Sequence, residues 1–146
     1  MVTRSAAQKR ARDKVEYDAF LAGCPSRQLL ARISDKWATL ILCALGGGTT
    51  GPGGEGAGEP RVMRYSELSR RLAGVSQKML TQTLRSLERD GLLTRTATPT
   101  VPVTVTYELT ALGLSLYRAV RVVKDWAQTH MDEVLAHRAE YEAGRT

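Results

Sequence analysis

The chain has 146 residues, of which 42% are hydrophobic and 25% are charged. These values are typical of one modest soluble domain and argue against wholesale disorder and against a coiled-coil rod. The formal net charge of +6 indicates a polyanionic partner, most often nucleic acid, although modest charge also serves solubility. The longest nearly apolar run, residues 37–45, has about half the length of a membrane span, so we expect no membrane contact.

Targeting and metal signals are weak. The first twenty residues alternate charged and small side chains and lack the apolar stretch of a secretory signal, so we expect a cytoplasmic protein. Its two cysteines, Cys24 and Cys43, are then reduced and are too few for a tetrahedral zinc site. His130 and His137 have no third ligand, so we predict neither a metal nor a cofactor.

The first predicted elements are helices. Tyr17 and Phe20 recur at helical spacing within an N-terminal arm or helix, residues 1–23, and Pro25 suits the first turn of a second helix. The apolar stripe of that second helix is Leu29, Leu30 and Ile33. The next segment, KWATLILCAL (36–45), is apolar on nearly every side and predicts the centre of the core.

A glycine-rich tract follows. Eight of the thirteen residues from Gly46 to Gly58 are glycine, which predicts a flexible loop over residues 46–60. A phosphate-binding P-loop needs Lys and Ser/Thr after its glycines, whereas Glu59, Pro60 and Arg61 stand here. Phosphate cradling is therefore not favoured.

After the loop the pattern is helix, tight turn, helix. Residues 65–72 form a short helix with Ser66 as its candidate N-cap. Ser76 caps a second helix that runs to Asp90, and Gly91 suits the position just past its end.

A hairpin and a long helix complete the chain. Strand-like residues 92–96 and 103–109 flank a turn with two prolines, and Thr110 then caps a long amphipathic helix with a break near His130. The apolar stripe of that helix is Leu112, Leu116, Ala119, Val123 and Trp126.

The helix over residues 76–90 has two distinct faces. The face expected to pack inward is Met79, Leu80, Thr83, Leu84 and Leu87. The opposite face, which has no acidic residue, is Lys78, Thr81, Gln82, Arg85 and Arg89. Arg and Lys can donate to guanine, Gln can pair with adenine, and Thr can contact phosphate or a thymine methyl. A solvated surface is the alternative, but residues 61–89 carry +5 of the net +6, which favours DNA.

Helix-turn-helix followed by a hairpin is the order of a winged helix. The segments CPSRQLLARISDKWATLILCAL, RYSELSRRLAGVSQKMLTQTLRSLERDGLLTRT and VPVTVTYELTALG resemble the HxlR-type family of bacterial winged-helix transcription regulators, relatives of the MarR group. The resemblance runs from Cys24 to about Trp126. Its most specific pieces are Lys36-Trp37, Ser76-Gln77-Lys78-Met79-Leu80, Asp90-Gly91-Leu92 and Tyr107-Glu108-Leu109-Thr110.

The resemblance implies a mainly α fold with a small β-hairpin, a winged helix-turn-helix with N- and C-terminal dimerisation helices. Within one domain, 1–146, it implies an arm over 1–23, the reading unit over 64–109 and C-terminal helices over 110–143. The expected homodimer binds double-stranded DNA at an inverted repeat, at the nucleoid, as a repressor or an activator. Bases would be read by Ser76, Gln77, Lys78, Thr81, Gln82 and Arg85, with backbone support from Arg64, Arg70 and Arg71. Candidate dimerisation residues are Tyr17, Phe20, Tyr117, Val120, Val123 and Trp126, unless they pack within the protomer.

The sequence departs from the family pattern in three places. The glycine-rich tract stands where relatives have a short turn, and Ser34-Asp35 stand where glycines are common. No Lys or Arg occurs between Arg95 and Arg118, so the wing tip lacks a cation for a minor groove. We therefore expect weak contacts between the wing and DNA.

Cys24 precedes Pro25 at a predicted helix N-terminus, where backbone N–H groups favour a thiolate. Some HxlR-type regulators sense oxidants or electrophiles through a cysteine at this position, which makes Cys24 the candidate redox sensor, although it can also serve only as a cap. Cys43 reads as a buried hydrophobe.

Two other functions compete with DNA reading. A winged-helix module could use the loop and basic face to bind an acidic protein partner, and a thiol-dependent enzyme could be built on Cys24. No catalytic constellation accompanies that cysteine, so we predict no enzyme and no catalytic residues. An oxidant or a small molecule remains a candidate effector.

Overall fold

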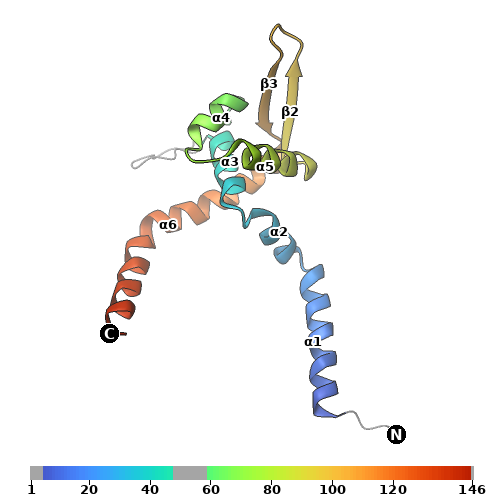
Figure 1. The fold of residues 1–146 in the computed structure, drawn as a ribbon, viewed down its shortest axis with the longest axis vertical. Helices are drawn as coiled ribbons and strands as arrows, with labels where there is room; N and C mark the ends of the chain where they lie inside the picture. Colours follow the sequence, from blue (N-terminus) through green and yellow to red (C-terminus); the bar gives the residue numbers. More distant parts are fainter. Residues whose placement is uncertain (1–4, 48–58, 146) are drawn as a thin grey trace. The chain divides into compact units, whose positions relative to one another are not determined.

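The computed structural model describes residues 5–47 and 59–145, and the chain divides into two compact units, Met1–Lys36 and Trp37–Thr146. Each unit is described by itself. The fold is mainly helical with one small antiparallel sheet, which confirms the predicted winged helix-turn-helix class (Figure 1).

The N-terminal unit consists of α1 (Ala6–Gly23) and α2 (Pro25–Ile33). Cys24 is the extended N-cap of α2, and Pro25 takes the first helical position, as predicted. No described side chain of this unit is buried, and Leu30 in the predicted stripe of α2 is 61% exposed. The unit therefore has no hydrophobic core of its own.

The core of the second unit is built around α3 (Lys36–Gly46), as predicted. Ile41, Leu42 and Leu45 are fully inaccessible to solvent. The backbone N–H of Arg61 donates to the Leu45 carbonyl oxygen at 2.9 Å, so the chain returns to the end of α3 after the glycine-rich tract. Most of the predicted flexible loop, residues 48–58, lies outside the described residues.

The helix-turn-helix is formed by α4 (Tyr65–Arg71) and α5 (Gln77–Arg89). The prediction that Ser66 caps α4 is wrong, because the N-cap is Arg64. Glu67 stands three residues after Arg64, and its carboxylate accepts the Arg64 N–H at 3.3 Å, so the helix starts earlier than the serine indicates.

The sheet contains β1 (Met63–Arg64), β2 (Leu93–Thr98) and β3 (Thr104–Leu109) in the order β1-β3-β2. The β2–β3 hairpin is the predicted one, whereas β1 was not predicted because its two residues are too few to show an alternating pattern. All pairs are antiparallel. The inner face near the base carries buried Met63, Leu93, Tyr107 and Leu109. The outer half of the hairpin extends beyond the helices as the wing (Figure 1).

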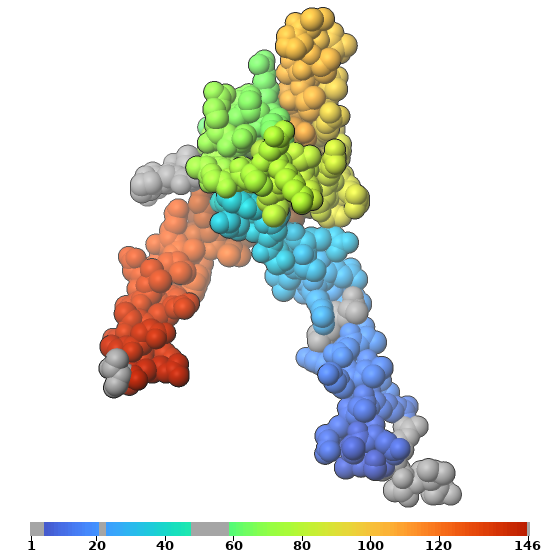
Figure 2. All heavy atoms as spheres, viewed as in Figure 1, coloured from blue at the N-terminus to red at the C-terminus, as the bar shows by residue number. Residues whose placement is uncertain are grey.

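The last helix, α6 (Ala111–Ala143), is continuous, so the predicted break near His130 is wrong. Neither glycine nor proline occurs between Gly113 and Gly144, so nothing in the sequence interrupts the helix. The Trp126 and His130 rings lie 4.9 Å apart between centroids along its surface. The second half of α6 projects from the packed part of the unit (Figure 2).

The inward face of α6 also differs from the predicted stripe. Its buried residues are Gly113, Tyr117 and Val120, whereas Leu112, Val123 and Trp126 are exposed. Two close approaches select this face. A Cβ on Gly113 would collide with the Leu92 carbonyl oxygen, and a Cβ on Gly46 would collide with the Tyr117 ring. The two glycines therefore permit the close packing that buries Tyr117 and Val120.

Candidate nucleic-acid interface

The start of α5 is fixed by Ser76, whose hydroxyl oxygen accepts the backbone N–H of Met79 at 3.1 Å, as predicted for the N-cap. Four of the five predicted inward residues are buried: Leu80, Thr83, Leu84 and Leu87. The fifth, Met79, is 38% exposed, so its prediction is wrong. Its neighbour Leu80 is fully buried, so the core-facing side of α5 begins at Leu80 and Met79 lies at the edge of that side.

The opposite face of α5 is open. Exposed side chains on it are Gln77, Lys78, Gln82, Arg85 and Arg89, and Thr81 is half-buried. Three cationic groups and two amides thus share the accessible side of the helix with the capping Ser76. A major groove admits a helix with this display, and its base edges accept or donate to these groups.

Tyr65 locks the two helices of the motif together, a role that sequence analysis missed. Its hydroxyl donates to the carbonyl oxygen of Gln77 at 3.1 Å and lies 3.3 Å from the Thr81 hydroxyl. The contact depends on how the turn folds α4 against α5, and no spacing rule reveals it. It also accounts for the partial burial of Thr81.

The three supporting arginines occupy different environments. Arg64 and Arg70 are exposed, and the Arg70 Nε donates to the Ser66 carbonyl oxygen at 3.3 Å. Arg71 is half-buried against the unit. Arg64 and Arg70 are therefore accessible to a DNA backbone, and Arg71 less so.

The end of α5 is tied to the wing and to α6. Gly91 has a φ of 75°, and backbone bonds Leu92 N to Leu87 O and Gly91 N to Glu88 O form a Schellman cap. The Thr110 hydroxyl donates to the Gly91 carbonyl oxygen at 2.6 Å and accepts the Gly113 N–H at 3.0 Å. Thr110, which directly follows β3, thus links the end of α5 to the start of α6. These bonds fix the position of α5 relative to the wing.

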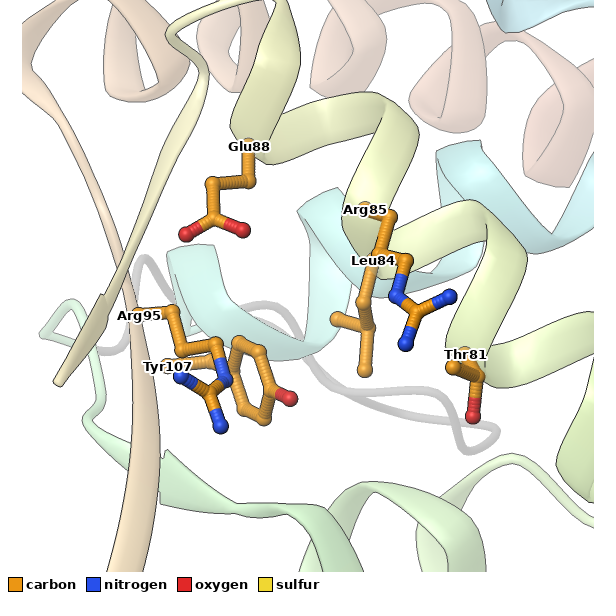
Figure 3. Close-up of a pocket in the computed structure, with 6 residues that line it drawn as sticks. All are labelled: Thr81, Leu84, Arg85, Glu88, Arg95 and Tyr107. Atoms are coloured by element: carbon orange, nitrogen blue, oxygen red, sulfur yellow. The ribbon is translucent and has the colours of Figure 1, made fainter. Parts of the chain in front are cut away.

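Between α5 and the wing lies a hollow of about 440 Å³ (Figure 3). It is lined by Thr81, Leu84, Arg85 and Glu88 of α5 and by Arg95 and Tyr107 of the hairpin. Arg95 is paired directly with Tyr107 in the β2–β3 register, so both side chains are on the face toward α5. The wing tip lacks a cation, as the sequence predicts, but this arginine at the wing base was not among the predicted site residues.

The candidate dimerisation residues divide into two groups. Tyr117 and Val120 lie in the core of the chain itself, so the prediction that they form a dimer surface is wrong. The structure leaves Tyr17, Phe20, Val123 and Trp126 exposed. On α1 no described side chain is buried, and α6 turns its Gly113, Tyr117 and Val120 face inward instead of the Val123 and Trp126 face.

The two cysteines differ in chemistry. The backbone N–H of Arg27, followed by that of Ser26, lowers the pKa of the partly exposed Cys24 thiol. Burial in the core raises the pKa of Cys43, as expected for a small buried hydrophobe.

No cluster of three metal-ligating side chains occurs within residues 5–47 and 59–145. No helix in that part of the chain is long and apolar enough to cross a membrane.

Known proteins with a similar sequence are helix-turn-helix regulators, in agreement with the arrangement of α4 and α5. Residues 56–135 match the sequence model of the HxlR-like helix-turn-helix family. The HTH-type transcriptional regulator YtfH of Escherichia coli is 42% identical over 125 residues, covering 86% of this chain and 89% of that protein.

Solved structures show the same fold. The transcriptional regulator YtfH from Salmonella typhimurium superimposes with a TM-score of 0.66 at 39% identity, over 82% of this chain and 96% of that one. The redox regulator HypR in its oxidized form gives a TM-score of 0.59 at 30% identity, over 73% and 96%. The chain belongs to the HxlR-like helix-turn-helix family of DNA-binding transcriptional regulators, which are not enzymes.

Proposed function

We propose that this regulator is a homodimeric repressor that inserts α5 of each protomer into successive major grooves of an inverted-repeat operator. The observation that carries the proposal is the open face of α5, where Lys78, Gln82 and Arg85 are exposed beside a fixed N-cap. The base-reading set is Ser76, Gln77, Lys78, Thr81, Gln82 and Arg85, with Arg64, Arg70 and Arg71 on the backbone. A protein that covers an operator in this way blocks transcription from it, at the nucleoid in the bacterial cytoplasm.

Exposed apolar side chains support the dimer. Phe20 on α1 is 71% exposed and Trp126 on α6 is 54% exposed, with Tyr17 and Val123 also open to solvent. Aromatic residues of this kind are typical centres of protein interfaces. Association of two chains through these helices would also place two α5 helices on one duplex, as an inverted repeat requires.

An oxidant is the effector that the structure favours. Cys24 is partly exposed and has a lowered pKa, the two properties that make a thiol reactive. The redox regulator HypR is among the structural relatives. We infer that oxidation of Cys24 changes the affinity of the protein for its operator.

Selection from a random duplex library tests the proposal, in reducing buffer and after mild oxidation near physiological salt. We expect an inverted repeat to be enriched in at least one of the two states. The degree of enrichment should differ between reduced and oxidised wild type, and it should not differ in Cys24→Ser. Absence of enrichment in both states would contradict DNA reading and favour an acidic protein partner.

Arg85→Ala then tests the role of α5 on the selected operator. We expect a loss of about 1–3 kcal/mol in binding free energy and relaxed preference at one base pair in each half-site. Arg138→Ala, at an exposed site in the last turns of α6, is the matched control and leaves the preference unchanged. Unaltered operator affinity in Arg85→Ala would contradict the proposal that α5 contacts the bases of the operator.

A further inference from the structure

Two arginines and one tyrosine face the hollow between α5 and the wing. Arg85 comes from α5, Arg95 from β2 and Tyr107 from β3, and Figure 3 shows the Tyr107 hydroxyl directed from the strands toward α5. Both arginines are exposed. Neither has a hydrogen bond or an ion pair to another side chain in the described part of the chain, and the same is true of the Tyr107 hydroxyl. Three hydrogen-bond donors thus line one hollow and have no side-chain acceptor there.

The hollow is held in shape by the surrounding structure. The Tyr107 side chain is buried at its base, and Arg95 extends beside it from the paired position on β2. The Schellman cap and Thr110 fix the end of α5 relative to the hairpin. The backbone positions that carry the three donors are therefore fixed relative to one another before any ligand arrives, which reduces the entropy lost on binding.

The acceptor that fits is a phosphate group. Guanidinium groups bind phosphate with two parallel N–H bonds, and a phenol hydroxyl can add a third donor. In the proposed docking α5 enters a major groove and the hairpin lies alongside it, so the hollow between them would face the DNA backbone. Glu88, which also lines the hollow, repels a phosphate from its side and so limits the positions that the strand can take.

We propose that Arg95 and Tyr107 form a seat for one DNA backbone phosphate in each half-site, with Arg95 as its cation, while Arg85 at the edge of the hollow points to the bases. This inference rests on the proposed DNA reading and deepens it. The wing, whose tip carries no Lys or Arg, then contributes its charge from its base. The contact fixes the register of α5 in the groove and does not itself read sequence.

Salt titration of full-length variants on the selected operator tests the seat. Arg95→Ala is expected to weaken binding about tenfold at low salt, by the same factor on the operator and on an unrelated duplex. The slope of log affinity against log salt falls by about 0.9 for each phosphate released. Arg95→Lys keeps the charge, so it retains the slope while losing part of the affinity. Arg138→Ala, distant on α6, serves as the control for loss of one charge.

Neutral phosphate analogues identify the contact directly. In duplexes with a single methylphosphonate scanned along the operator, one position in each half-site is expected to weaken the wild type and leave Arg95→Ala unaffected. Glu88→Gln is expected to tighten binding on every sequence, because it removes the repelling charge.

The outcomes separate this inference from the proposed function. If the wild type binds no duplex, DNA reading itself fails. If the wild type binds but Arg95→Ala keeps its full salt slope, the seat does not exist. If Arg95→Ala changes preference at one base pair instead of weakening binding uniformly, Arg95 contacts a base edge and the phosphate seat is overturned.

Discussion

The second unit of the chain, Trp37–Thr146, and the N-terminal helices α1 and α2 differ in how far their apolar side chains are buried. In α3, α4, α5 and the sheet, leucines such as Leu42, Leu68 and Leu84 are almost wholly inaccessible. In α1 and α2 no described side chain is buried, and Phe20 and Leu30 are open to solvent. The Trp37–Thr146 unit carries its own core, whereas α1 and α2 lack the burial that stabilises helices in water. The difference fits the proposed homodimer, in which a second chain would cover the helices that have no core of their own.

The largest expected effect compares one leucine from each region. Leu42→Ala leaves a cavity in the core and is expected to lower the free energy of unfolding by about 2–5 kcal/mol. Leu30→Ala, at a 61% exposed site on α2, is expected to cost less than about 0.5 kcal/mol at protein concentrations where the chain is monomeric. Urea unfolding followed by circular dichroism measures both. Equal losses would show that α2 has a core of its own and would break the comparison.

A smaller effect is expected at the exposed face of α6. Trp126→Ala is expected to raise the dimer dissociation constant by about thirtyfold or more, which corresponds to about 2 kcal/mol for a central aromatic residue of an interface. Unfolding of the monomer should change little. Sedimentation velocity over a range of concentrations measures the constant, and Gln128→Ala on the same helix is the control. A wild-type chain that stays monomeric at micromolar concentration would contradict the prediction.

The smallest effect concerns the two thiols. Because the pKa of Cys24 is lowered in the folded chain, its thiolate persists to lower pH than that of the unfolded chain. When the pH is lowered toward neutrality, the alkylation rate of Cys24 in the folded chain should therefore fall at a lower pH than the rate of an unfolded thiol. Cys43, buried and with a raised pKa, should react mainly after unfolding. Mass spectrometry of iodoacetamide-treated protein measures both sites. Identical Cys24 rates in native and denatured chains would remove the basis for a sensor.

Local patterns predicted the reading unit well because its signals lie close together in sequence. Ser76 and Thr110 cap α5 and α6 as their positions indicate, and Gly91 ends α5 with a positive φ. The two-residue strand β1 and the contact of Tyr65 with α5 gave no such signal. Both depend on partners that are distant in the sequence, Tyr107 for the strand and Gln77 for the tyrosine.

The sequence by itself determined the helix-turn-helix, the hairpin and the basic face of α5, because capping, periodicity and charge act over a few neighbouring residues. Only the tertiary structure decided which face of α6 turns inward and which cation serves the wing. Close approach at Gly46 and Gly113 permits the packing that buries Tyr117, whereas Trp126 is exposed. Strand register brings Arg95 beside Tyr107 and toward α5. Such contacts join residues far apart in the chain, and packing rather than local preference selects among them.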